Sequence, residues 1–302
     1  MALVTDPLTL SAVLTAWRFE PTTAVAVVGV GAAYALGVVR RARTVPWIRV
    51  TVFAFGLLCW FYAGSGFLGV YSDTLFWVRA LQVLLLLSLA PLCLAFGKPL
   101  TVLRDALDEP ARARMDALLD TGFARGLVHP ITTSAAMLLT PWLLYMTGWY
   151  RTLLENGVVD AVTRLLLVVI GFGYYYARLQ ADPVPHRYSQ AISLIITTVE
   201  TLGDGILGVV LWQGSVLIAS YYAGRGWGPS PRTDQTIGAG ILWILGDVIG
   251  LPLLLMLLQA FSSDERRKEV VVDQELDEEF DAAPASGLWW ENDPQLRDRF
   301  RR

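Results

Sequence analysis

The sequence is poor in the residues that carry most metal and catalytic chemistry. Its 302 residues include 2 histidines and 2 cysteines, and its 5 methionines are scattered. No two histidines, cysteines or methionines stand at the spacing of a soft-metal motif, and no Ser-His-Asp or Cys-His set is placed for nucleophilic catalysis. The residues themselves therefore predict neither an enzyme nor a cofactor.

Charge is scarce as well. Charged residues make up 17% of the chain, against about 25% in typical soluble domains. The chain has no basic tract and no glycine-rich phosphate loop, which argues against nucleic acid and nucleotides as partners. Hydrophobic residues reach 54%, and they come in long blocks. The composition predicts a polytopic membrane protein whose first partner is the lipid bilayer.

The apolar blocks predict an all-α bundle of seven transmembrane helices. Each block is close to the roughly 20 residues that a helix needs to cross a bilayer. We expect the third block, Val78–Gly97, to organise the bundle, because this apolar helix begins with Arg79 and Gln82 on one face. The expected spans are residues 21–39, 47–67, 78–97, 127–146, 158–176, 191–212 and 236–259.

The distribution of arginine and lysine predicts the orientation of these helices. Basic residues concentrate in the loops after the first, third and fifth spans and directly after the last span. The opposite side carries few of them: Arg18, Arg79, Arg151, Arg225 and Arg232. Because basic loops stay in the cytoplasm, we expect the N-terminus outside and the C-terminus in the cytoplasm.

The chain divides into three predicted parts. Residues 1–20 form an external N-terminal segment, 21–261 the membrane domain, and 262–302 a cytoplasmic tail whose polar composition predicts disorder. In the tail, Trp289 and Trp290 are either a docking motif or the interface-seeking end of an unstructured segment.

The longest internal loop, 98–126, contains a predicted helix. It starts at Asp108, Glu109 and Pro110, as expected for acidic residues and proline in a first turn. This amphipathic helix lies either on the membrane surface or against the bundle.

Several polar side chains are predicted to lie inside the bundle. Each charge near the bilayer centre costs about 2.5–3.5 kcal/mol, so these groups should face one another or water. With Arg79 and Arg164 as the only cations expected there, at least one acid should be protonated or lie in a wet cavity. Six of these side chains fall near the outer face, namely Arg79, Gln82, Asp160, Arg164, Asp234 and Gln235, and three acids lie deeper, namely Glu200, Asp204 and Asp247.

Two interpretations of these polar groups stay open at this point. They form either a site for a substrate, an ion or a partner, or a structural ion-pair network that fixes the helix register.

A set of short motifs in a fixed order runs through the membrane part. The most specific is Asp234–Trp243, followed by Gly246, Asp247 and Pro252. Others are residues 17–21, Arg49 with Gly56, Gln82, Pro91, 97–99, His129 with Pro130, 180–183, Tyr222 and 263–266. On these residues the chain resembles the CtaG-type cytochrome c oxidase assembly proteins, especially their actinobacterial branch.

The resemblance implies a multi-pass protein of the bacterial plasma membrane with seven spans. Such proteins help to mature the copper centres of a respiratory oxidase, so copper and oxidase subunits are the implied ligand and partners. The family pattern has histidines at four positions that hold Arg79, Val83, Asp160 and Arg164 here, and of that pattern only Gln82 is kept.

Arginine cannot lose a proton to bind a metal. Our hypothesis is therefore a divergent assembly factor that acts as a scaffold, or as partner of a copper-competent protein, without binding copper at this site. Its Arg79, Asp160, Arg164 and Asp234 would form ion pairs instead. The alternative is a transporter or channel that uses Glu200, Asp204 and Asp247 for protons or cations.

Overall fold

The computed structural model describes residues 6–41, 44–179, 190–214 and 225–250, with four isolated positions beyond them and without the side chains of 190–197. The chain divides into two units, Met1–Leu254 and Leu255–Arg302. All helices named below belong to the first unit. The predicted tail 262–302, with Trp289 and Trp290, lies outside the described residues apart from positions 262, 273 and 274.

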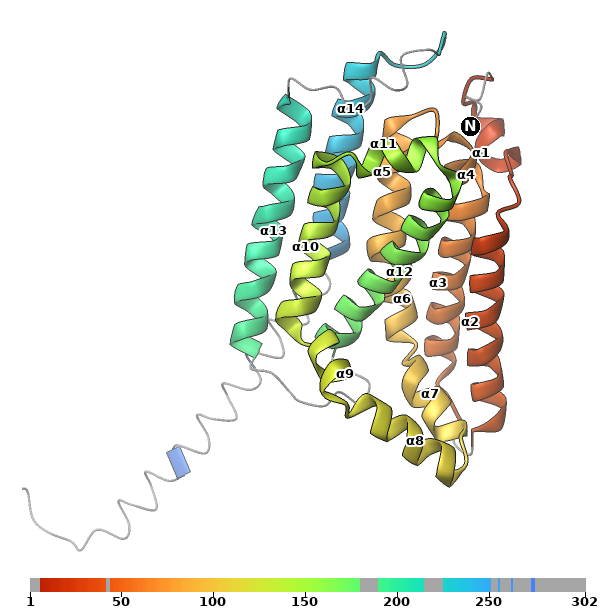
Figure 1. Cartoon of the computed structure of the whole chain (residues 1–302), viewed down its shortest axis with the longest axis vertical. Coiled ribbons are helices and arrows are strands. Elements are labelled where there is room, and N and C mark those ends of the chain that lie inside the picture. The colour runs from red at the N-terminus through yellow and green to blue at the C-terminus, as the bar shows by residue number, and fades with distance from the viewer. Residues whose placement is uncertain are drawn as a thin grey trace, which may run out of the picture. The chain divides into compact units, whose positions relative to one another are not determined.

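The described residues form helices and no strand, which confirms the all-α class (Figure 1). Two of the elements, η1 and η3, are single π-helical turns. In chain order the elements are α1 (Leu10–Thr15), α2 (Pro21–Arg40), α3 (Trp47–Ser65), α4 (Phe67–Tyr71), α5 (Phe76–Leu84), η1 (Leu85–Leu89), α6 (Ala90–Phe96), α7 (Pro99–Ala106), α8 (Glu109–Leu119), α9 (Gly122–Leu127), α10 (Pro130–Met146), α11 (Trp149–Glu155), α12 (Gly157–Leu179), α13 (Gln190–Gln213), α14 (Pro231–Gly240) and η3 (Ile241–Leu245).

Four helical segments in the described ranges are long and apolar enough to cross a membrane. They are Pro21–Arg40, Trp47–Tyr71, Phe76–Phe96 and Gly157–Leu179, and they match the first, second, third and fifth predicted spans. The other three predicted spans fall on α10, on α13, and on α14 with η3. Seven spans and the orientation of the termini therefore stay predictions.

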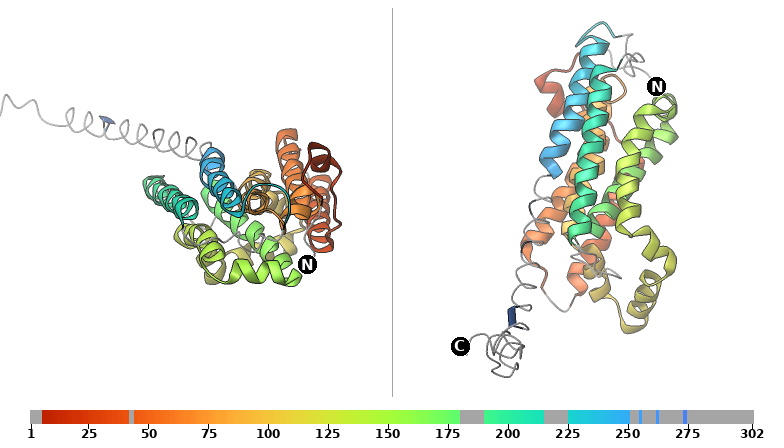
Figure 2. Two further views of the ribbon diagram at one scale, coloured as in Figure 1. Left: turned by 90° about the horizontal axis from the view of Figure 1, so that it is seen from above. Right: turned by 90° about the vertical axis from the view of Figure 1, so that its left-hand side faces the viewer.

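The third apolar block is the most deeply buried of these four segments. Of its most apolar window, 78% is buried, compared with 17% for α2. Its residues pack against α3, α12 and α14, and Phe76 and Leu86 are among the fully buried side chains. The helix that carries Arg79 in its first turns is thus surrounded by the others. Figure 2 shows the same bundle from above and from one side.

This central helix is interrupted by the π-turn η1. Pro91 follows the turn and has no N–H to donate, so a regular α-helical bond to the Leu87 carbonyl is impossible. The Leu87 carbonyl lies so close to Gly171 of α12 that a side chain at 171 would collide with it. The sequence thus combines a proline-induced irregularity with a glycine that lets α12 approach the exposed backbone.

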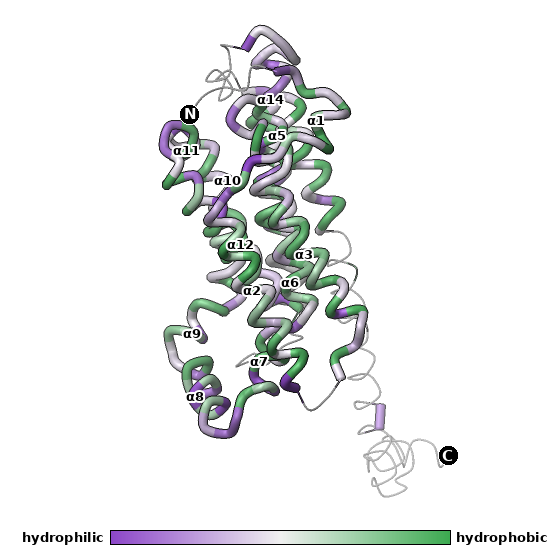
Figure 3. Tube along the Cα trace, turned by 90° about the vertical axis from the view of Figure 1, so that its right-hand side faces the viewer, coloured by the Kyte–Doolittle hydropathy of each residue, from purple (hydrophilic) through white to green (hydrophobic). Residues whose placement is uncertain are grey.

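The helices α7 to α9 lie at one end of the bundle, and α8 mixes hydrophilic and hydrophobic residues (Figure 3). Lys98 leads into α7 with a φ of 52°, and Asp108 caps α8 by accepting from the Ala111 N–H at 3.3 Å. The predicted helix start is therefore confirmed. None of the residues of α8 is buried, which argues against packing in the core, and its place on the membrane surface stays a prediction.

Candidate functional site

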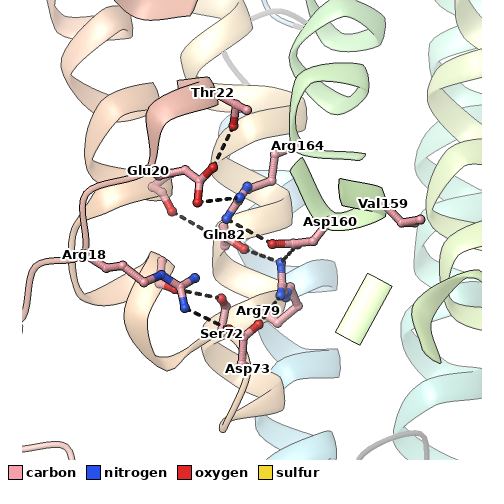
Figure 4. Close-up of polar contacts among 12 residues, drawn as sticks. Arg18, Glu20, Thr22, Ser72, Asp73, Arg79, Gln82, Val159, Asp160 and Arg164 are labelled. Atoms are coloured by element: carbon pink, nitrogen blue, oxygen red, sulfur yellow. Dashed lines mark hydrogen bonds and ion pairs between the residues drawn. The ribbon is translucent and has the colours of Figure 1, made fainter. Parts of the chain in front are cut away.

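Three arginines and three acids form one continuous chain of ion pairs at the end of the bundle where α5 and α12 begin (Figure 4). We call this set, Arg18, Glu20, Asp73, Arg79, Asp160 and Arg164, the ion-pair network. Arg18 and Glu20 come from the segment before α2, Asp73 from the turn before α5, and the others from α5 and α12.

Arg79 stands at the middle of the network. Its Nη1 donates to Asp160 Oδ1 at 2.6 Å and to Gln82 Oε1 at 2.9 Å, and its Nη2 donates to Asp73 Oδ1 at 2.7 Å. Gln82 in turn donates to the Ala63 carbonyl of α3 at 2.6 Å. One guanidinium therefore joins α5 to α12 and to the preceding turn, and through Gln82 to α3.

The network continues in both directions from Arg79. Asp160 Oδ2 lies 3.1 Å from Arg164 Nη1, and Arg164 Nη2 lies 3.2 Å from Glu20 Oε2. On the other side, Asp73 Oδ2 accepts from Arg18 Nη1 at 3.1 Å. Charges alternate in sign along the whole chain, so the three arginines balance the three acids.

The centre of the network is out of reach of solvent. The side chains of Arg79, Asp160 and Arg164 are 3%, 2% and 4% exposed, whereas Arg18 at one end is 33% exposed. Buried charges are tolerated when they are paired and hydrogen-bonded, and removing one partner strands the other. Each central charge of the network therefore has a partner beside it inside the bundle.

Sequence reasoning brought together part of this network and missed the rest. The pairs Arg79 with Gln82 and Asp160 with Arg164 follow from helical spacing. Asp73, Arg18 and Glu20 were not assigned to the polar cluster, because they lie in connecting segments. The sequence feature that could have identified them is their position, since each stands within a few residues of the start of a helix.

The expectation that Arg79 and Arg164 are the only cations available to the acids is wrong. Arg18, Arg178 and Arg225 also pair with acids inside the bundle. The expectation did not consider the length of the arginine side chain. Arg18 and Arg225 lie in segments outside the helices, and their side chains extend from these segments to a helix end.

Asp234 forms a second polar site at the same end, separate from the network. Its two carboxylate oxygens accept from the N–H groups of Phe76 and Trp77 at 3.0 and 2.9 Å, and Arg225 Nη2 lies 3.0 Å away. An acid at a helix start satisfies free N–H groups and complements the helix dipole. Asp234 therefore caps α5 from α14. Its neighbour Gln235 donates to the Leu211 carbonyl of α13 at 2.9 Å.

The deeper acids do not join the network. Glu200 accepts from Tyr174 Oη at 2.7 Å and from Arg178 Nη2 at 2.9 Å. Arg178 is in the last turn of α12, so Glu200 lies toward the opposite end of that helix from Asp160. Asp204 and Asp247 line a cavity together with Glu200.

The donor set at the network does not fit copper. The four positions at which the resemblance implies histidines hold two guanidinium groups, which have no lone pair to offer, the apolar side chain of Val83, and one carboxylate whose oxygens are both engaged. In the part of the chain that the structure describes, no three side chains of His, Cys, Asp or Glu lie close enough to hold a metal ion. His129 instead caps α10, accepting from the Ile131 N–H at 3.2 Å.

Comparison with known proteins gives relatives but no solved structure that matches. The uncharacterized protein Mb0105 of Mycobacterium bovis is 25% identical over 290 residues, covering 91% of this chain and 44% of that protein. The uncharacterized protein ML1998 of Mycobacterium leprae is 24% identical over 278 residues, covering 87% and 42%. The chain thus spans less than half the length of these curated relatives.

The sequence pattern of one family covers most of the chain. The family is described as cytochrome c oxidase caa3 assembly factor (Caa3_CtaG), and its pattern matches residues 32–263. The matched range includes α3 to α14, and so most of the ion-pair network. The chain therefore belongs to the cytochrome c oxidase caa3 assembly factor family.

Proposed function

We propose that this chain assists the assembly of a respiratory cytochrome c oxidase in the bacterial plasma membrane as a scaffold, without binding copper at the ion-pair network. The supporting observation is the 2.6 Å bond between Arg79 and Asp160, two residues at positions of the family's histidines. A guanidinium cannot serve as a copper ligand, and its partner carboxylate is already used.

The geometry also supports a permanent structural role for this site. For a metal to reach Asp160, it would have to displace Arg79 and Arg164 together. Each guanidinium would then lose one of its two acidic partners, Arg79 keeping Asp73 and Arg164 keeping Glu20. Breaking two buried pairs and adding the charge of a metal beside them is costly in a low-dielectric interior. In this chain, ion pairs therefore join the helices at this position.

The proposed mode of action is non-enzymatic. A scaffold presents a rigid surface to its partners. In this proposal the network keeps the bundle rigid, because its contacts join α3, α5, α12 and the segment before α2. The proposed partners are oxidase subunits or a copper-competent assembly protein. Transport of protons or cations through Glu200, Asp204 and Asp247 is the weaker candidate, because the family is one of assembly factors.

The test combines metal analysis with partner capture on the full chain in detergent. After copper loading, we expect no stoichiometric copper in the wild type, and we expect co-purification with oxidase subunits. A variant with Arg79→His, Val83→His, Asp160→His and Arg164→His serves as the positive control for copper at this position. Arg151→Gln, which alters an exposed arginine on α11, is the matched control for partner capture.

The proposal fails if the wild type holds stoichiometric copper that Asp160→Asn removes. It also fails if oxidase subunits are not retained by a wild-type chain that is folded. Capture of subunits together with absence of copper supports it.

A further inference from the structure

The segment before α2 carries four large apolar side chains that are exposed in the structure. Leu10 and Leu14 are 90% and 76% exposed, and Trp17 and Phe19 are also largely exposed. All four precede the first candidate membrane span, which begins at Pro21, so they do not serve to carry a helix across the bilayer. Large apolar side chains gathered in one exposed segment mark a contact surface. We call these four side chains the apolar edge.

The short helix α1 has one packed face and one exposed apolar face. Ala12 and Val13 pack against the core of the bundle, and Tyr62 Oη of α3 donates to the Val13 carbonyl at 2.9 Å. Leu10 and Leu14 are one helical turn apart and therefore share the exposed face. A helix that is fixed to its protein on one side and apolar on the other is suited to lie along a membrane interface.

The residues that follow α1 are exposed and paired in alternation. Trp17 and Phe19 are exposed, whereas Arg18 and Glu20 make the ion pairs at the two ends of the ion-pair network. The backbone is extended at Glu20, with φ of −113° and ψ of 102°, and extended chain places successive side chains on opposite sides. This stretch therefore has a charged side toward the network and an apolar side away from it.

The apolar edge continues the exposed apolar surface of a candidate membrane span. The Trp17 ring lies 6.1 Å from that of Phe61 and 5.6 Å from that of Tyr62, both near the end of α3. One turn earlier on this helix, Leu58 is 65% exposed, and it belongs to the span Trp47–Tyr71. Tryptophan and tyrosine concentrate where a span meets the lipid headgroups. The surface that faces lipid along α3 thus leads directly to Trp17.

We propose that the apolar edge inserts into the lipid bilayer at the interface on this end of the bundle and anchors the segment before α2 there. Figures 1 and 3 show α1 at the same end of the bundle as α11, beside the ends of the long helices. The last turn of α1 has no basic residue, and Arg18 is engaged with Asp73. The contact is therefore made with the apolar part of the lipid rather than through charged headgroups. The proposal does not depend on the role in oxidase assembly.

The first test is electron paramagnetic resonance of a spin label in phosphatidylcholine nanodiscs. Leu14→Cys is labelled in a full chain that also carries Cys59→Ala and Cys93→Ala. Accessibility of the label is measured to oxygen, which dissolves in lipid, and to a water-soluble nickel chelate. Val28→Cys, at an exposed position of the span α2, is the reference for lipid. Arg151→Cys, at an exposed position of α11, is the reference for water.

The expected result is a lipid environment at position 14. The ratio of oxygen to nickel accessibility should be several-fold above that at position 151 and close to that at position 28. A ratio equal to that at position 151 would show the apolar edge in water and overturn the proposal. Low accessibility to both reagents would also overturn it, because the label would then be covered by a second copy of the chain.

The second test keeps both native cysteines and uses the intact membrane. A benzophenone amino acid replaces Leu14, and after irradiation we expect adducts that add the mass of a phospholipid to the chain. The same amino acid in place of Arg151 should give no lipid adduct, because that side chain is exposed on α11. Adducts at position 14 with protein alone would assign the apolar edge to a protein partner and refute the lipid anchor.

Discussion

The ion-pair network and the cavity are both charged regions inside one bundle, yet they handle charge in opposite ways. In the network each acid has an arginine within 3.2 Å, and signs alternate from Arg18 to Glu20. Of the acids that line the cavity, Glu200 has an arginine partner, and the described residues provide none for Asp204 or Asp247. In the network every charge has a partner of opposite sign, whereas at the cavity part of the acidic charge has none among the described residues. The contrast predicts that substitutions in the two regions change the stability of the fold to different extents.

The largest expected effect comes from breaking the network at its centre. Arg79→Leu removes the partner of Asp73 and Asp160 together, leaving the Asp73 carboxylate paired only with Arg18 and that of Asp160 only with Arg164. Breaking a buried pair in this way costs about 3–5 kcal/mol. Unfolding in mixed detergent and SDS micelles measures the loss. The exposed Arg151→Leu should change little, and an equal loss in both variants would contradict a structural network.

The second largest effect is expected at the paired acid of the cavity. Glu200→Gln keeps the shape of the side chain but removes the negative charge to which Arg178 and Tyr174 donate. Because a charge-assisted hydrogen bond contributes about 1.5–3 kcal/mol, we expect a loss of that order in the same unfolding assay. If Glu200→Gln is as stable as the wild type, the Arg178 pair contributes nothing and Glu200 belongs with the unmatched acids.

The matching change at an unmatched acid should have the opposite sign. Asp204→Asn removes a carboxylate that has no counter-charge among the described residues. We expect no loss of stability, and a gain of at most about 1 kcal/mol, because the burial penalty of that charge disappears. Comparison of the Tm of Asp204→Asn with that of Asp160→Asn measures this. A loss as large as that of Asp160→Asn would break the distinction between the two regions.

The smallest effect is expected at an exposed pair outside the membrane-spanning helices. Hydrogen bonds from the Arg104 guanidinium hold the pKa of Asp116 below its ordinary value of 3.8. A depressed folded-state pKa gives stabilisation that is present above the unfolded value and is lost as the pH falls through the folded value. Because both groups are exposed and screened by salt, the effect should be slight.

Its measurement is the pH dependence of Tm at low salt. The wild type should lose slightly more stability than Asp116→Asn as the pH drops below 3.8. Asp120→Asn, whose carboxylate lies 4.0 Å from Arg125, is the control and should follow the wild type.

The helices could be predicted from sequence because the bilayer fixes their length. The first predicted span, 21–39, differs from Pro21–Arg40 by a single residue, and the cap at Asp108 marked the start of α8. The break after Ser65 was harder to place, because the apolar run continues through the short α4 to Tyr71. The π-turn η1 was not predicted, although Pro91 is the residue that accounts for it.

Half of the candidate site could be predicted, for a physical reason. Helical spacing places Arg79 with Gln82 and Asp160 with Arg164, since residues three or four apart share a face. The pairing of Arg18, Glu20 and Asp73 depends on how the connecting segments fold over the helix ends. The periodicity of a sequence contains no information about that. The pairing of Glu200 with Arg178 likewise depends on the packing of α12 against its neighbours.

The cap on α5 has a consequence for the order in which the bundle is completed. The first N–H groups of the central helix are satisfied by Asp234, a residue 158 positions later in the chain. A ribosome delivers α5 to the membrane long before it delivers α14. Before α14 is in place, Asp234 cannot accept from the first N–H groups of the central helix. The partial positive charge of these N–H groups then adds to the charge of Arg79 nearby. The innermost helix therefore reaches its final, capped state only when the last helices have been added.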